Sequence, residues 1–137
     1  MKNGEYQILL KELLPLVQKE FEQIGEIRRL TQELSEAFDR NDQVIVKMLL
    51  KMRGDAMVET EKAVRSQNML KNAFKTESRR LEQILSGDPL LDETSLNDIE
   101  KRIFTLKRTK REALKRTIEI DRIVNKRLTG NRSFYET

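Results

Sequence analysis

Apolar side chains recur every three or four residues along most of this 137-residue chain, and this spacing constrains its fold more than any other feature. Such a stripe lies along one side of an α-helix, and a spacing of about 3.5 is typical of helices packed along a supercoiled seam. Pro15 falls inside the first stripe, so the first helix either kinks there or begins near it. The first stripe consists of Leu10, Leu13, Leu14, Val17, Phe21, Ile24, Ile27, Leu30, Leu34 and Phe38.

Two further stripes follow, and together the three predict helices over about residues 5–38, 43–86 and 96–128. The first break is a short polar stretch in which Asn41 or Asp42 can cap the second helix. Connections this short favour antiparallel neighbours, so the first two helices should form a hairpin.

The third helix has a recognisable start and end. Ser95 and Asp98 have the spacing of a capping box, and Gly130 is a typical residue for the C-terminal end of a helix. We therefore predict one helical domain over residues 1–130, followed by a flexible tail over residues 131–137.

Glycine and proline are scarce, with five and two residues respectively. That is too few turn-forming residues for a sandwich, a barrel or a doubly wound sheet. The fold class predicted is all-α, an elongated antiparallel three-helix bundle or coiled coil built on a long helical hairpin.

The chain contains no cysteine and no histidine, which excludes thiolate and imidazole catalysis, disulfides and the common zinc sites. We expect no cofactor, no metal and no enzymatic activity. The apolar runs are also shorter than a signal peptide or a membrane span requires. The expected location is the cytoplasm.

Charge is distributed unevenly along the chain. Residues 95–132 contain 12 basic and 5 acidic side chains, a net charge of +7, whereas residues 1–94 contain 15 basic and 17 acidic ones, a net charge of −2. One interpretation is a surface for nucleic acid. The alternative is a solvated face whose cations pair with acidic residues of the first helix, and we favour it because aromatic residues are not interleaved with the cations.

The third helix also carries a second apolar stripe, made of Phe104, Leu114 and Ile118. A contiguous apolar strip exposed to water usually marks a binding surface, and it could accept an amphipathic helix. The alternative is that these residues fill the far side of a three-helix core.

Two segments resemble the FlgN family of flagellar type III export chaperones and the related FliT group. They are LTQELSEAFDRND at residues 30–42 and VKMLLKMR at residues 46–53, and the segment NKRLTG at residues 125–130 followed by Tyr135 is also similar. The resemblance implies a cytoplasmic chaperone that keeps hook–filament junction proteins competent for export.

Members of that family bind the C-terminal segment of their client mainly through the C-terminal helical region. Carried onto this chain, the resemblance implies that the partner-binding residues are Phe104, Leu106, Leu114, Ile118 and Ile120.

Two other functions stay open. One is a nucleic-acid-associated helical protein that uses the basic third helix. The other is a structural coiled coil whose apolar stripes are used in self-association, with a homodimer as the simplest form.

Overall fold

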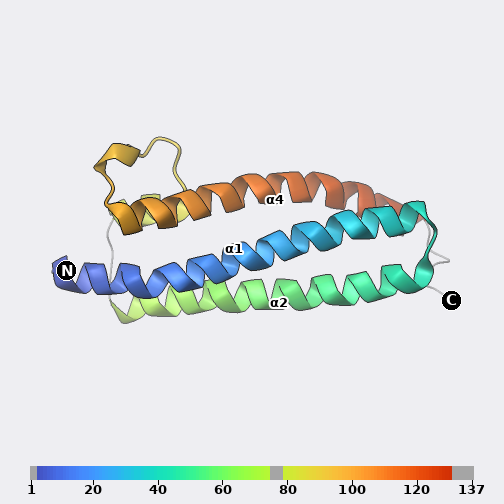
Figure 1. Ribbon diagram of the computed structural model, residues 1–137, viewed down its shortest axis with the longest axis horizontal. Coiled ribbons are helices and arrows are strands. Elements are labelled where there is room, and N and C mark those ends of the chain that lie inside the picture. The colour runs from blue at the N-terminus through green and yellow to red at the C-terminus, as the bar shows by residue number, and fades with distance from the viewer. Residues whose placement is uncertain (1–2, 75–78, 131–137) are drawn as a thin grey trace.

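The protein is an elongated bundle in which one long helix lies between two others (Figure 1). The computed structural model describes residues 3–74 and 79–130, and within them the chain is helical, without strands. The prediction of an all-α fold built on a long helical hairpin is confirmed, and the predicted tail over residues 131–137 lies outside the described residues. The elements are α1 (Asn3–Asp39), α2 (Gln43–Ala73), α3 (Arg79–Ser86), the 3₁₀ turn η1 (Glu93–Ser95) and α4 (Asp98–Gly130).

The hairpin between α1 and α2 forms where the sequence predicts it. Asn41 adopts a left-handed conformation with φ of 54°, which asparagine tolerates better than most residues. Asp42 then caps α2 by accepting a hydrogen bond from the backbone N–H of Ile45 at 3.1 Å. Near its other end, α1 runs without a break through Pro15. This excludes the alternative of a first helix that begins only near that residue.

One predicted boundary is wrong, because the helix expected over residues 43–86 is two helices. α2 ends at Ala73, and α3 starts a new helix at Arg79 that lies beside the start of α4 (Figure 1). A continuous helix would extend about 18 Å past Phe74, beyond the start of α1 and away from the core. The separate helix instead buries Leu81 and Ile84 completely.

The start of α4 also differs from the prediction. The reciprocal capping pair is Asn97 and Glu100, not Ser95 and Asp98. The Asn97 side chain accepts a hydrogen bond from the Glu100 N–H at 2.9 Å, and the Glu100 carboxylate accepts one from the Asn97 N–H at 3.0 Å. Ser95 closes the preceding 3₁₀ turn.

The core consists of two apolar clusters. The first lies towards the α1–α2 turn and contains residues of α1, α2 and α4, among them Ile24, Leu34 and Val124. The second lies towards the N-terminus and also includes α3, with Leu13 and Ile84 among its members. Between these two clusters each of the three long helices contributes one buried polar side chain, Glu20, Gln67 and Lys107.

A buried hydrogen-bonded layer separates the two clusters. The Glu20 carboxylate, 1% exposed, accepts hydrogen bonds from Lys107 at 2.7 Å, Lys110 at 2.6 Å and Gln67 at 2.9 Å. Lys107 also donates to the Gln67 side-chain oxygen at 2.6 Å. Burial alone would raise the pKa of Glu20, but these donors outweigh it and lower the pKa. The layer therefore holds an ionised carboxylate in the middle of the bundle.

This layer fixes how α4 is aligned along α1 and α2. Sliding α4 by one turn would place a charged group against apolar side chains, and an unpaired buried charge is costly. A polar layer inside an apolar seam is a known way to specify the register of packed helices.

We expect Glu20→Ala to lower the free energy of unfolding by about 3–5 kcal/mol, because it leaves Lys107 buried without its carboxylate. Urea denaturation monitored by circular dichroism measures this, with Glu22→Ala, an exposed residue two positions away on the same helix, as the control. A loss below about 1 kcal/mol for Glu20→Ala would mean that the layer does not contribute as described.

Candidate functional site

The second apolar stripe of α4 lies on one side of the helix, but only part of it is open. Phe104 is 1% exposed and belongs to the cluster that includes α3, so the alternative of a core residue is correct for it. Leu114 is half-buried, and Ile118 is 50% exposed. The stripe is therefore covered at the Phe104 end and open at the Ile118 end.

The other two residues expected to bind a partner do not lie on this stripe. Leu106 packs against the N-terminal cluster and Ile120 against the other, and both are half-buried. Ile120 borders a surface groove between α1 and α4, and Leu106 borders a shallow hollow beside Lys101 and Arg102 of α4. Leu106, Leu114, Ile118 and Ile120 each line a surface hollow, and Leu114 and Ile118 are the two that share one.

The helix that covers Phe104 is α3, and a polar cluster ties it to the start of α4. Arg80 donates two hydrogen bonds to the Glu100 carboxylate, at 2.7 and 2.9 Å, and Tyr6 of α1 donates a third at 2.7 Å. Burial would raise the pKa of Glu100, but the bonds from Arg80, the Asn97 backbone and Tyr6 outweigh it and hold the pKa at about 2. Burial and the bond to Glu100 raise the pKa of Tyr6.

Gly87 determines where α3 stops covering α4. Its φ of 65° is left-handed, and a Cβ at this position would approach the Arg108 backbone to 3.2 Å. Glycine allows both the reversal of the chain and its close approach to α4. The chain turns away here, and α4 continues without α3 beside it.

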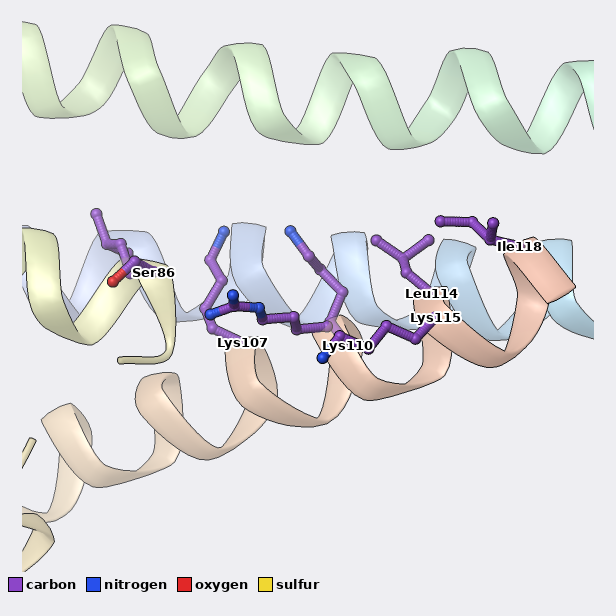
Figure 2. A pocket seen from close by; sticks show the side chains of 8 residues that line it. Ser86, Lys107, Lys110, Leu114, Lys115 and Ile118 are labelled. Atoms are coloured by element: carbon purple, nitrogen blue, oxygen red, sulfur yellow. The ribbon is translucent and has the colours of Figure 1, made fainter. Parts of the chain in front are cut away.

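Beyond the end of α3 lies a groove with a volume of about 420 Å³. Figure 2 shows Ser86 at one end of it, with Leu114 and Ile118 pointing from α4 towards the side of α2. Its lining is apolar along the middle and basic at the edges. The lining residues are Leu85, Ser86, Lys107, Lys110, Arg111, Leu114, Lys115 and Ile118.

α2 contributes apolar side chains on the same side of the bundle. Arg53 forms an ion pair with Asp121 of α4, and Lys71 forms one with Glu82 of α3 at 2.6 Å, so this face of α2 is directed at α3 and α4. Met57 and Val64 lie between Arg53 and Lys71 at helical spacing on this face. Met57 is 39% exposed and Val64 is half-buried. The apolar surface near the groove thus involves two helices.

The cations of α4 divide into paired and unpaired groups. Lys107 and Lys110 pair with Glu20, and Arg127 pairs with Asp39, as expected if cations of the third helix neutralise α1. Within the part of the chain that the structure describes, Arg111 and Lys115 have no hydrogen bond or ion pair. The acidic residues Glu26 and Glu33 of α1 pair with Arg29 on the same helix instead.

Among residues 3–74 and 79–130, no group of three acidic side chains is placed to hold a metal ion, and no helix is long and apolar enough to cross a membrane. No model of a protein family, no curated protein and no solved structure matches the chain. The groove is therefore interpreted from its own geometry.

Substitutions should separate the covered from the open end of the stripe. Phe104→Ala removes a fully buried aromatic side chain and should cost about 3–5 kcal/mol in the free energy of unfolding. Ile118→Glu changes an exposed residue and should cost less than about 1 kcal/mol. Thermal denaturation of the two variants measures this, and a large loss for Ile118→Glu would show that Ile118 is a core residue.

The ion pair that holds α3 predicts a pH dependence. The pKa of Glu100 is lowered from 4.5 to about 2, so its ionised form stabilises the fold above about pH 5, and this contribution is lost as the pH falls towards 2. The shift corresponds to about 3 kcal/mol. Urea denaturation should show a difference between wild type and Glu100→Gln that shrinks by about that amount between pH 7 and pH 2. A difference independent of pH would contradict this role for Glu100.

Proposed function

We propose that the protein binds an α-helix of a protein partner in the groove beside Leu114 and Ile118, and acts as a chaperone or adaptor for it. The observation that carries this proposal is the divided stripe of α4. At its Phe104 end the stripe is covered by a helix, α3, and at its Ile118 end the same side of α4 is open. A surface that already packs a helix along half its length is suited to pack another along the rest.

The family resemblance supplies a specific partner for this proposal. A FlgN-type flagellar export chaperone would bind the C-terminal region of hook–filament junction proteins in the cytoplasm and keep it competent for export. The two main segments that carry the resemblance, residues 30–42 and 46–53, form the end of α1, its turn and the start of α2, and the third, residues 125–130, ends α4. The two main segments lie in the hairpin, whereas the proposed client site lies on α4.

Calorimetric titration with C-terminal fragments of hook–filament junction proteins tests this function. We expect saturable binding with a negative heat-capacity change that persists at moderate salt, because apolar surface is buried. Leu114→Glu/Ile118→Glu should abolish the binding while leaving the helical content nearly unchanged, with a lower Tm because Leu114 also packs against the core cluster. Ile118→Glu alone should weaken the binding and leave Tm nearly unchanged. The matched control is Ile123→Glu, since Ile123 is 59% exposed and lies about half a turn around α4 from Leu114.

The absence of binding to every such fragment would contradict a flagellar client. Binding that is unaffected by Leu114→Glu/Ile118→Glu would contradict the groove as its site.

Nucleic-acid binding is the second candidate, and the unpaired cations of α4 are the observation that favours it. It predicts an affinity for oligonucleotides that falls steeply with salt. Against it, the aromatic side chains that the structure describes are all buried or half-buried, so they offer no stacking platform.

Self-association through the groove, for example in a homodimer, predicts instead an oligomer that dissociates on dilution.

A further inference from the structure

Basic residues recur along one face of α4 at regular spacing. Lys101, Arg108, Lys115 and Arg122 are seven positions apart and share one face of α4. Lys115 and Arg111 line the groove itself. The open apolar surface beside Leu114 and Ile118 therefore has a positively charged border.

The chain itself shows which groups this surface accepts where it is covered. α3 packs with Leu81 and Ile84 buried, which are three positions apart on its inner face. Its outer flank carries Glu82, whose carboxylate lies 2.6 Å from Lys71 of α2. In the next segment Glu93 pairs with Arg108 of α4 at 2.5 Å. Together these contacts place apolar side chains of α3 on the core side and carboxylates on cations at the border.

We propose that the groove binds an amphipathic helix with acidic flanks, which lies end to end with α3 and extends the short fourth helix of the bundle. The proposal rests on the proposed function and specifies the chemistry of its partner. The apolar face of the bound helix contacts Leu114 and Ile118, and its carboxylates approach Arg111 and Lys115. Charge complementarity of this kind selects the partner and speeds its association.

The dimensions of α4 set the length of the bound helix. From Leu114 to Arg127, α4 extends about 20 Å, which accommodates about four turns of a neighbouring helix. A helix of this length is marginal in water by itself. It would form on binding, with apolar residues at positions i, i+3, i+4 and i+7 towards the groove.

The test uses two designed peptides of about 18 residues with the same Leu pattern, one with Glu and one with Lys on its flanks. Fluorescence anisotropy of each labelled peptide with the full-length protein at low salt gives the two affinities. We expect the Glu peptide to bind at least about tenfold more tightly than the Lys peptide, because charge contacts at the border are weakly screened at low salt.

Neighbouring residues of α4 provide a matched pair of variants. Lys115 lines the groove, whereas Arg116 lies on the other side of the helix beside Arg28 and Glu36 of α1. Both side chains are exposed, so neither substitution should affect folding. Arg111→Glu/Lys115→Glu should reverse the preference towards the Lys peptide, whereas Arg116→Glu should leave it unchanged. Ile118→Glu should lower the affinity for the Glu peptide about tenfold, and Ile123→Glu should leave that affinity unchanged.

Several results would overturn the inference. They are equal affinity for the two peptides, no binding of either peptide, a preference unchanged by Arg111→Glu/Lys115→Glu, and a wild-type dimer that Ile118→Glu converts to a monomer, since a second copy would then occupy the groove. An oligonucleotide bound in a manner that depends on Lys115 but not on Ile118 would also overturn it.

If hook–filament fragments fail to bind but the Glu peptide binds as described, the flagellar client is wrong and this inference stands. If the fragments bind and the peptides show no preference, the flagellar client stands and this inference is wrong.

Discussion

The buried bond between Glu20 and Lys107 is the interaction on which the placement of the other elements depends. It joins α1 to α4 at 2.7 Å, and Gln67 of α2 bonds to both side chains. Once Lys107 lies opposite Glu20, the rest of α4 is fixed along the bundle. Phe104 then falls in the N-terminal cluster under α3, and Leu114 falls beyond the end of α3.

The open groove results from the unequal lengths of the helices. α1, α2 and α4 contain 37, 31 and 33 residues, whereas α3 contains 8. The bundle therefore has four helices at one end and three at the other. Gly87 sets the boundary, because its conformation and its closeness to Arg108 require the chain to turn away. An apolar stripe that continues past this boundary has no helix of this chain to cover it among residues 3–74 and 79–130.

The regular parts of the fold could be predicted from the sequence. Helical spacing identified the long helices, and the polar stretch narrowed the cap of α2 to Asn41 or Asp42, of which the structure shows Asp42. The break after Ala73 could not be seen, since Leu70, Phe74, Leu81 and Ile84 keep a spacing that also fits one continuous helix. The cap of α4 was misplaced because two overlapping pairs have capping-box spacing, and only the structure shows that Asn97 and Glu100 form it.

The polar layer left a trace in the sequence, because its residues stand at core spacing. Glu20 lies three residues after Val17 and four before Ile24, which is a core position, and Gln67 occupies such a position in α2. Polar residues at core spacing on separate helices predict a shared buried layer, but spacing alone does not show which residues meet. For a similar reason, the sequence could identify the stripe on α4 but could not show which end of it is covered. A stripe identifies residues on one side of a helix, and only the position of α3 decides that Phe104 is covered and Ile118 is not.

The central claim is that the open side of α4 beyond α3 packs a partner helix, and thiol accessibility tests it most directly. The chain contains no cysteine, so Ile118→Cys and Ile123→Cys each introduce a single thiol on opposite sides of α4. Labelling rates are measured with and without a saturating C-terminal fragment of a hook–filament junction protein or the Glu peptide. The account predicts that the partner slows labelling at position 118 about tenfold and leaves position 123 unchanged, in line with exclusion of water from a packed contact. Equal effects at the two positions, or slowing only at position 123, would contradict it.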